Sequence, residues 1–380
     1  MERLGCEPRS GWRAQVELRG LTWHTPGAQY WSEGTYYEFE SDAIDLIERA
    51  TNELHTLCLK AVQHVIDTKR YAQLCIAEAA VPLIEASWMA KSPSLYGRLD
   101  LAFDGLAPPK LLEYNADTPT ALLEAAVIQW DWLRGLFPEA DQFNSLHERL
   151  VAAWKSMRSS VPADDTRGQV VHFASMDDDR EDGTTSAYLA DTATQAGYGV
   201  RLLAIGDVGW NDGAGEYRDL DDQKIRTLCK LYPWEWIMRD PFGAHVAASG
   251  TLFIEPPWKM VLSNKGLLPI LWEMFPDSPW LLPAYFDGPH DLSEWARKPL
   301  LSREGANVIV HTRAGEFASE GAYGTEGFVY QQLAPIPEFD GCRPVLGSWI
   351  IGGEAGGMGI RESDGWITAN SSRFVPHLFR

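Results

Sequence analysis

The sequence predicts a mixed α/β (α+β) fold, and three stretches of the chain carry that prediction. Residues 41–66 place apolar side chains at helical spacing, which indicates one long amphipathic helix. Residues 98–114 contain two short alternating runs joined by a turn at Pro108 and Pro109, which indicates a strand pair. Residues 170–205 are expected to form a strand, a polar loop, a helix ended by Gly197 and a second strand. A β-α-β unit of this kind has parallel strands and a right-handed crossover.

The first 160 residues are predicted to form an N-terminal helical region that includes the strand pair at 97–118. After an irregular aromatic lead-in over residues 1–36, Ser41 is the expected cap of the long helix. A second helical segment is expected over 71–88, divided by Pro82. Two further helices are expected over 119–134 and 141–157.

An Asp-rich polar break at 162–167 indicates a boundary, after which residues 161–262 are predicted to form a Rossmann-like α/β substrate region. No GxGxxG follows its first strand, which disfavours nucleotide binding by that route. The loop expected over 177–185 begins with acidic residues that are either solvated or recognise an amine, since ligands of open α/β sheets lie at that edge. Residues 225–240 are expected to form a helix that runs into an aromatic turn.

Residues 263–380 are predicted to form a third region of helix and strands. A helix begins near Asn264, strands cover 294–301, 307–310 and 328–333, and two more surround a Gly-rich turn. Lys265 lies at a helix start, where a lysine costs a few tenths of a kcal/mol; it is either near an anion or simply exposed. Gly305 lies between two strands, either as a turn residue or in a loop whose N–H groups cover phosphate.

Charge and composition narrow the class of partner. The 53 acidic and 33 basic residues give a formal charge of −20, which argues against a nucleic acid or an anionic membrane and favours a cationic small molecule. No run of about 18 apolar residues is present, so a cytoplasmic protein without a membrane span is expected. Five widely spaced cysteines without a CxxC pair indicate reduced thiols.

The strand pair at 98–114 carries the residues with the most evident chemistry. Asp100, Glu113 and Asn115 are hard oxygen donors on adjacent strands, as Mg²⁺ requires. Arg98 beside them indicates a phosphate or carboxylate. The alternative is that these residues form the solvated face of an edge strand.

Six phrases extend this interpretation because of their joint order: GRLDLAFDG, LLEYNADTPT, SNKGLLPILW, RKPLLSREGANV, YQQL and GGMGIRE. Together they resemble stand-alone synthetase members of the glutathionylspermidine synthase family over essentially the whole chain. The resemblance implies an ATP-grasp fold with a Rossmann-like pre-ATP-grasp unit, and a nucleotide-binding region at 263–380. It also implies ATP-dependent amide-bond formation between a peptide or amino-acid carboxylate and an amine such as a polyamine.

The resemblance assigns roles to individual residues. It implies that ATP and Mg²⁺, with two ions expected, bind at residues matching the family's motifs. The matching residues are Asp100, Glu113 and Asn115 for the metal, Arg98 for the phosphoryl group, Lys265 and Lys298 for ATP phosphates, Gln331, Gln332 and Leu333 for adenine, and Arg361 near the peptide. Gly305 is the expected phosphate-covering glycine.

Three departures from the family concern the substrates and the domain content. Thr118 stands where well-known members have serine, and Asp182 where they have a glutamate that positions substrate. Asp182 is also a candidate to bind the ammonium group or accept its proton. No segment matches the amidase domain of bifunctional members, so a synthetase alone is expected.

Three functions are compared on these residues. The first is a carboxylate–amine ligase that works through an acyl phosphate and releases ADP and phosphate. The second is a catalytically silent ATP-binding sensor, which does not need both the arginine and all three metal ligands. The third, a cysteine hydrolase, is disfavoured because no cysteine has a histidine partner in a recognisable motif.

Overall fold

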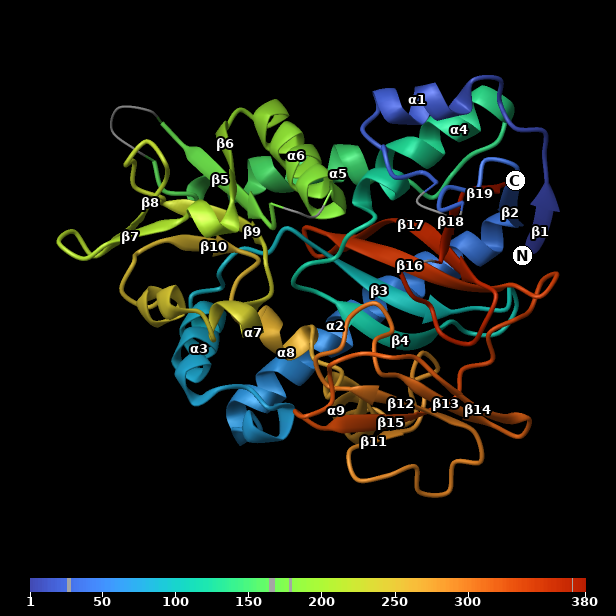
Figure 1. The fold of residues 1–380 in the computed structure, drawn as a ribbon. Helices are drawn as coiled ribbons and strands as arrows, with labels where there is room; N and C mark the ends of the chain where they lie inside the picture. Colours follow the sequence, from blue (N-terminus) through green and yellow to red (C-terminus); the bar gives the residue numbers. More distant parts are fainter. Residues whose placement is uncertain (26–28, 164–167, 178–179, 371) are drawn as a thin grey trace.

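The computed structural model describes residues 1–25, 29–163, 168–177, 180–370 and 372–380 and confirms the mixed α/β fold. Its central sheet has the strand order β18-β17-β16-β3-β4 and lies at the middle of Figure 1. The strands are β3 (Tyr96–Ala102), β4 (Lys110–Asn115), β16 (Arg343–Ile351), β17 (Glu354–Ser363) and β18 (Arg373–Val375). All neighbouring pairs in this sheet are antiparallel. The predicted strand pair therefore continues into a sheet built mainly from the C-terminal segment.

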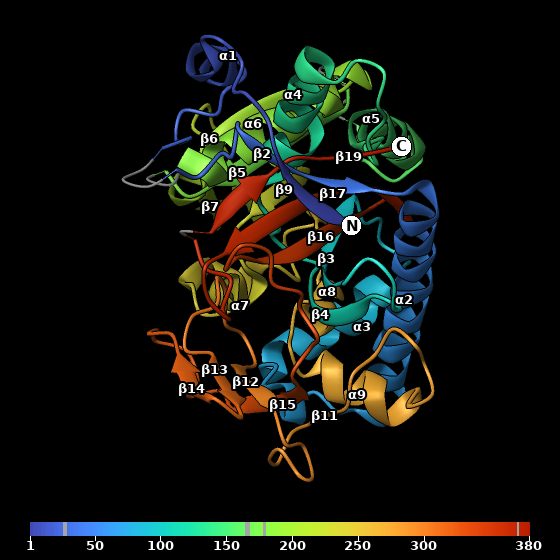
Figure 2. The ribbon, with the colours of Figure 1, turned by 90° about the vertical axis from the view of Figure 1, so that its right-hand side faces the viewer.

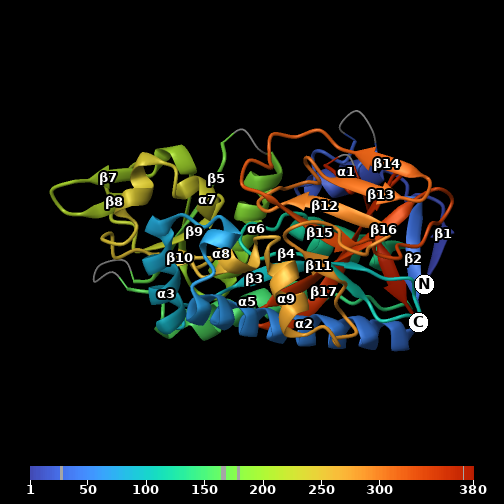
Figure 3. The same cartoon turned by 90° about the horizontal axis from the view of Figure 1, so that it is seen from below.

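The long helix α2 (Ser41–Thr68) supports this sheet along the length of the molecule. It buries Ile47, Leu54 and Val62, spaced as the sequence predicted, and contacts β16 and β17. Figures 2 and 3 show it extending along one side of the protein. The expectation that Ser41 is the cap was wrong by one residue: Glu40, in extended conformation, precedes the first turn and makes no side-chain cap bond.

A four-stranded parallel sheet forms the Rossmann-like unit, with the order β10-β9-β5-β6. Its elements are β5 (Val170–Ser175), α6 (Arg180–Gln195), β6 (Gly199–Ala204), β9 (Thr227–Leu231) and β10 (Leu252–Ile254). The pair β5 and β6, connected by α6, confirms the predicted β-α-β unit.

Two expectations for this unit were wrong. Residues 225–240 contain the strand β9 where a helix was expected. All five residues of β9 are buried, and a strand that is buried on both faces lacks the alternation of apolar and polar residues by which strands are predicted. Residues 180–185 belong to α6 and not to a polar loop; Glu181 and Asp182 are in its first turn. The neighbouring Asp178 and Asp179 lie outside the described residues.

A five-stranded antiparallel sheet, β11-β15-β12-β13-β14, lies below the central sheet in Figure 1. It comprises β11 (Ala284–Tyr285), β12 (Trp295–Pro299), β13 (Ile309–Thr312), β14 (Gly315–Ala318) and β15 (Phe328–Gln332), and α9 (Leu267–Met274) packs against it. The strands expected at 294–301, 307–310 and 328–333 are thus confirmed with shifted ends.

The two ends of the chain meet in a third sheet, where β2 pairs with both β1 and β19 (Figure 1). The remaining elements complete the layers around the sheets. They are β1 (Glu2–Gly5), α1 (Trp12–Leu18), β2 (Thr35–Phe39), α3 (Val81–Met89), α4 (Gln129–Leu136), α5 (Leu146–Ser156), β7 (Gly209–Asn211), β8 (Glu216–Arg218), α7 (Trp234–Ile237), α8 (Lys259–Leu262) and β19 (His377–Phe379).

Three helices expected in the N-terminal region are shorter than predicted. Over 71–88 the only α-helix among the described residues is α3, which has Pro82 in its first turn, where the missing proline N–H costs nothing. Over 119–134 a π-helical segment (Glu124–Ile128) precedes α4, and over 141–157 the α-helix is α5. No helix in the described ranges is long and apolar enough to cross a membrane. The division of the chain into three regions at residues 160 and 262 stays a prediction. The central sheet combines β3 and β4 of the first region with β16, β17 and β18 of the third.

Candidate active site

Strand register brings the oxygen donors of β3 and β4 together. Asp100 lies opposite Glu113, and Arg98 lies opposite Asn115. Asn115 Nδ2 donates hydrogen bonds to Asp100 Oδ2 at 3.1 Å and to Glu113 Oε1 at 3.0 Å. Because residues two apart in a strand share a face, the three side chains expected as metal ligands form one cluster.

Basic side chains neutralise this cluster from two sides. Arg98 holds Asp100 with Nε at 2.7 Å from Oδ1 and Nη2 at 3.1 Å from Oδ2, and its Nη1 donates to the Thr120 carbonyl at 2.8 Å. Lys265 Nζ lies 2.9 Å from Glu113 Oε2. The anion that the position of Lys265 suggested is therefore at least in part a carboxylate of the protein.

The two carboxylates respond differently to this environment. Burial raises the pKa of Asp100 above its usual value, and the opposing effect of Arg98 does not cancel it. Burial also acts to raise the pKa of Glu113, but the nearby charges of Lys265 and Lys298 outweigh it and lower that pKa to about 2. Glu113 is thus a firmly ionised carboxylate.

Lys298, on β12, connects the five-stranded antiparallel sheet to β4. Its Nζ donates to the Leu112 carbonyl at 2.8 Å and to Gln331 Oε1 at 2.7 Å. Gln331 Nε2 in turn donates to the Leu111 carbonyl at 2.8 Å. Burial, the largest effect, lowers the pKa of Lys298 to about 8, although Glu113 opposes this shift.

Two adjoining cavities unite the residues that the sequence singled out. One has a volume of about 340 Å³ and the other of about 110 Å³, and Asp100, Glu113 and Gly305 line both. The predicted residues are distributed as follows: Arg98, Asn115, Thr118, Asp182 and Arg361 line the larger cavity, and Lys265, Lys298, Gln331, Gln332 and Leu333 line the smaller one.

Backbone N–H groups of the expected adenine hinge are already bonded within the protein. The Gln332 N–H donates to the Pro283 carbonyl at 2.8 Å, and the Leu333 N–H donates to the Glu294 carbonyl at 3.0 Å. A hinge that reads adenine in this conformation therefore uses acceptor groups or side chains rather than these two N–H groups.

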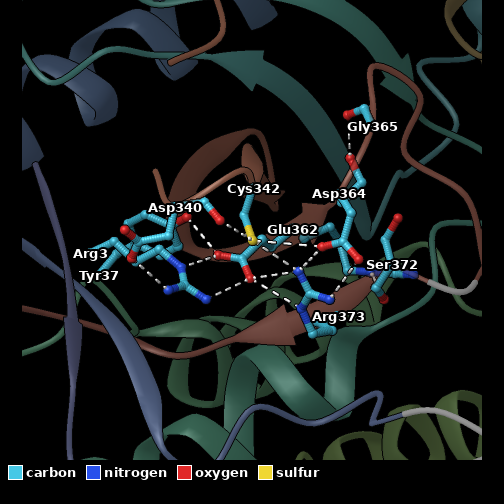
Figure 4. Close-up of polar contacts among 11 residues, drawn as sticks. Arg3, Tyr37, Asp340, Cys342, Glu362, Asp364, Gly365, Ser372 and Arg373 are labelled. Atoms are coloured by element: carbon cyan, nitrogen blue, oxygen red, sulfur yellow. Dashed lines mark hydrogen bonds and ion pairs between the residues drawn. The ribbon is translucent and has the colours of Figure 1, made fainter. Parts of the chain in front are cut away.

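Arg361 is fixed by the segment that follows its strand. Its guanidinium donates to the carbonyls of Ser372 at 3.2 Å and Ala369 at 3.0 Å, and its Cζ lies 5.2 Å from the centre of the Tyr30 ring. The adjacent Glu362, fully buried, accepts hydrogen bonds from other elements (Figure 4).

The Glu362 network joins both ends of the chain. Arg3 Nε and Tyr37 Oη each lie 2.7 Å from Glu362 Oε2, and Arg373 Nε lies 3.1 Å from Oε1. Arg373 immediately follows the carbonyl of Ser372 that accepts from Arg361. The network in Figure 4 thus supports the segment that orients Arg361 at the cavity.

The donor set of β3 and β4 fits Mg²⁺. Within the described ranges, no group of three or more His, Cys, Asp and Glu side chains is placed to hold a metal. Mg²⁺, however, is commonly bound by one or two carboxylates with water and substrate phosphates completing its shell. Asp100 and Glu113 supply the carboxylates, and a rotation of the Asn115 amide exchanges Nδ2 for Oδ1 at the same point.

Sequence reasoning missed four residues at the larger cavity or beside it. Arg303, which lines the cavity, contacts Thr118 and Glu235, and the fully buried Lys230 pairs with Asp117. Asp117 and Arg303 lie inside two of the six family-like phrases, and this position could have identified them as site residues. Their partners lie in the Rossmann-like unit, where nothing local marks them.

Comparison with known protein families gives a consistent picture. A family model described as glutathionylspermidine synthase preATP-grasp matches residues 3–380. A Haemophilus influenzae protein named "Putative acid–amine ligase" is 45% identical over 366 residues, which cover 93% of this chain and 92% of that protein.

Two further relatives are less similar to this chain. Trypanothione synthetase of Crithidia fasciculata is 29% identical over 85% of this chain and 53% of its own length. Bifunctional glutathionylspermidine synthetase/amidase of Escherichia coli is 27% identical over 90% of this chain and 58% of its own length. The chain therefore spans little more than half of either protein.

A solved structure shares the fold. A glutathione synthetase-like effector from Globodera pallida superposes with a TM-score of 0.60, covering 98% of each chain at 9% sequence identity. At this identity the likeness concerns the fold alone, which is of the ATP-grasp type.

Proposed function

Because the chain belongs to the glutathionylspermidine synthase family and is a ligase of that type, we propose that it joins a peptide or amino-acid carboxylate to an amine. ATP supplies the energy, and ADP and phosphate are the other products. One observation carries the proposal: Arg98, Asp100, Glu113 and Asn115 meet the two lysines where the two cavities adjoin.

In the first step, an oxygen of the substrate carboxylate attacks the γ-phosphorus of ATP, and the bond to ADP breaks. This step brings negative charges together, so positioned positive groups are its main requirement. Lys265 and Lys298 neutralise phosphate charge from the smaller cavity, and Arg98 offers a planar fork to the acyl phosphate in the larger one.

Asp100, Glu113 and Asn115 are the proposed Mg²⁺ ligands. When bound there, Mg²⁺ would neutralise negative charge on the phosphate oxygens. Without it, Arg98 keeps Asp100 and Lys265 keeps Glu113 in place through the ion pairs described above. Two ions are proposed, since ATP-dependent phosphoryl transfer commonly uses phosphate-bridging metals.

In the second step, the neutral amine attacks the acyl carbonyl, the amide bond forms, and the C–O bond to phosphate breaks. The ammonium nitrogen loses one proton to become the attacking amine and a second one, to the departing phosphate, as the amide forms. Asp182, half-buried in the first turn of α6 and lining the larger cavity, is proposed to bind the ammonium form and accept a proton. Thr118 and Arg361 are proposed to contact the acid substrate.

Release of ADP over an array of acids and amines tests the proposal. Glutathione and spermidine are the first pair, because the name of the Escherichia coli relative contains both. ADP release that needs both partners and Mg²⁺, and that falls at least 100-fold in Asp100→Asn, supports the ligase. ATP binding without ADP release from any pair favours the alternative, a catalytically silent ATP-binding sensor.

A further inference from the structure

Arg361 lines the larger cavity, and carbonyl groups of the segment that follows its strand hold its guanidinium. Nε donates to the Ser372 carbonyl at 3.2 Å, and Nη2 donates to the carbonyls of Ala369 at 3.0 Å and Asn370 at 3.2 Å. Nη1 makes no hydrogen bond within the described ranges. Nη1 is therefore available to an anionic ligand.

The ring of Tyr30 packs against the same guanidinium. Arg361 Cζ lies 5.2 Å from the ring centre, a distance at which a cation is attracted to the aromatic face. Phe374 connects the main chains of the two residues. Its N–H donates to the Tyr30 carbonyl at 2.7 Å, and it is the partner of Arg361 in the register of β17 and β18. The position of Tyr30 relative to Arg361 is therefore fixed by the main chain as well as by the ring.

Glu124 fixes the orientation of the Tyr30 ring. Tyr30 Oη donates to Glu124 Oε1 at 2.7 Å, and both side chains are buried. Glu124 begins the π-helical segment, a rare conformation that is frequent at functional sites. This segment packs directly on β17, where a Cβ on Gly359 would lie 3.4 Å from Ala125 Cβ. Tyr30 thus connects a buried carboxylate to a cation of the candidate site.

The charge of Glu124 depends on pH in the neutral range. Burial, the largest effect, and the charge of Glu181 in the first turn of α6 raise the pKa of Glu124 to about 7, although Tyr30 and Arg361 act to lower it. Glu124 is therefore mostly anionic above about pH 7 and mostly neutral below it.

The elements that pack against the π-helical segment are α4, α5 and β17. The residues that α5 buries are uncharged, and its charged residues Glu148 and Lys155 are exposed. Other charged groups of these elements have partners of their own, which are Arg19 with Asp131, Arg149 with Glu354, and Arg3 and Arg373 with Glu362. Glu181 and Arg361 are therefore the charges that act on Glu124.

We propose that Glu124, acting through Tyr30, is the positioning residue of Arg361 and that its charge state sets how strongly Arg361 holds the acid substrate. This inference rests on the proposed ligase function, in which Arg361 contacts that substrate. An anionic Glu124 repels the substrate carboxylate and competes for the charge of the guanidinium, whereas a neutral Glu124 leaves that charge to the substrate. By reciprocity, binding of the acid favours uptake of a proton by Glu124.

The KM for the acid as a function of pH tests the inference. It is measured by ADP release at saturating ATP and amine, with the pair that the array identifies. In the wild type we expect this KM to rise about tenfold between about pH 6 and about pH 8.5, because a bound anion close to Glu124 couples its affinity to that titration. Calorimetry of acid binding in two buffers of different ionisation enthalpy measures the proton taken up, independently of turnover.

Two variants separate the charge of Glu124 from its hydrogen bond. Glu124→Gln keeps an acceptor for Tyr30 but cannot ionise, so its KM for the acid is expected to stay at the low-pH value at every pH, without proton uptake. Tyr30→Phe keeps the ring but removes the hydrogen bond that lowers the pKa of Glu124, so the rise in KM is expected to begin at a higher pH. A KM that rises with pH in Glu124→Gln as it does in the wild type overturns the inference.

Tyr198 and Arg158 give a matched control. Arg158 Cζ also lies 5.2 Å from the centre of the Tyr198 ring, and neither residue is among those that line the two cavities. Tyr198→Phe is expected to leave the KM for the acid and its pH dependence unchanged. If Glu124→Gln does not fold, as judged by its thermal midpoint, Tyr30→Phe carries the test, and an unshifted pH profile overturns the inference.

The wild type separates this inference from the proposed function. An active wild type whose KM for the acid does not change with pH, and which takes up no proton on binding the acid, overturns this inference alone. A wild type that is inactive with every pair overturns the proposed function together with the inference.

Discussion

Asp100 and Glu113 face each other across the register of β3 and β4, and the Asn115 amide bonds to both carboxylates. Such a pair brings two carboxylates together in a partly buried place, and a divalent cation between them relieves their repulsion. We therefore expect Mg²⁺ to raise the thermal midpoint by a few degrees when ADP is present.

Variants of the two carboxylates test whether the Mg²⁺ effect on the thermal midpoint arises at this site. Asp100→Asn and Glu113→Gln are expected to abolish the Mg²⁺-dependent increase in thermal midpoint, whereas Asp277→Asn, at an exposed position, keeps it. An undiminished increase in both site variants would exclude these residues as metal ligands.

Gly305 tests the placement of the loop between the cavities. Gly305→Ala adds a Cβ within 2.5 Å of the Thr368 carbonyl oxygen at a φ of +69°. We expect a loss of about 1–3 kcal/mol in the free energy of unfolding and a higher KM for ATP.

Gly215→Ala is the control that separates backbone strain from steric collision. Gly215 has a φ of +66°, and no atom lies within 4 Å of a Cβ added there. Gly215→Ala is expected to cost only about 1 kcal/mol, measured by urea unfolding, with KM unchanged. Equal costs and equal kinetics in the two variants would show that the loop does not pack as described.

The buried pair of Lys230 and Asp117 is expected to affect stability strongly. Lys230→Met leaves the Asp117 carboxylate buried without its cation, which typically costs about 3–5 kcal/mol. Urea unfolding of Lys230→Met, Asp117→Asn and the double variant measures the coupling. We expect the double variant to lose clearly less than the sum of the single losses; strict additivity would contradict a direct interaction.

Buried histidines predict how stability depends on pH. Burial lowers the pKa of His377 to about 3, and burial together with Lys259 lowers that of His55 to about 4. The unfolded chain protonates histidine near pH 6.5, so this contribution to stability is complete above about 6.5 and is lost as the pH falls toward about 4. Each histidine contributes a slope of about 1.4 kcal/mol per pH unit.

The free energy of unfolding between pH 6.5 and 5 measures this slope. His377→Gln is expected to reduce the slope by about 1.4 kcal/mol per pH unit, while His311→Gln, at a partly exposed position, leaves it unchanged. A slope that His377→Gln does not alter would mean that His377 is not buried in its neutral form.

Local patterns predicted the elements whose two faces differ. The buried side of α2 follows from Ile47, Leu54 and Val62, and the shared face of Asp100 and the Arg98 side chain follows from strand alternation. The strand β9 was missed because all its residues are buried, including Lys230, whose charge is compensated by a residue from another region. No period distinguishes such a strand from a helix.

The candidate site could be predicted from the sequence for a different reason. Most residues that line the two cavities lie within the six phrases or close to them, so the joint order of the phrases located them, whereas Met176, Asp182 and Trp236 come from the Rossmann-like unit. The contact between Arg303 and Glu235 joins a loop to α7 across 68 positions and depends on how the sheets pack. Periodicity and spacing contain no information about such a contact.

The transfer of oxygen from the acid substrate to phosphate tests the central claim most directly. The acid identified by the array, labelled with ¹⁸O in its carboxylate, is incubated with ATP, Mg²⁺ and the amine, and the phosphate released is analysed by mass spectrometry. An acyl phosphate requires one ¹⁸O atom in each phosphate formed, because the carboxylate oxygen that attacked phosphorus leaves with it. Phosphate without the label, formed along with the amide, would contradict the mechanism proposed for this site.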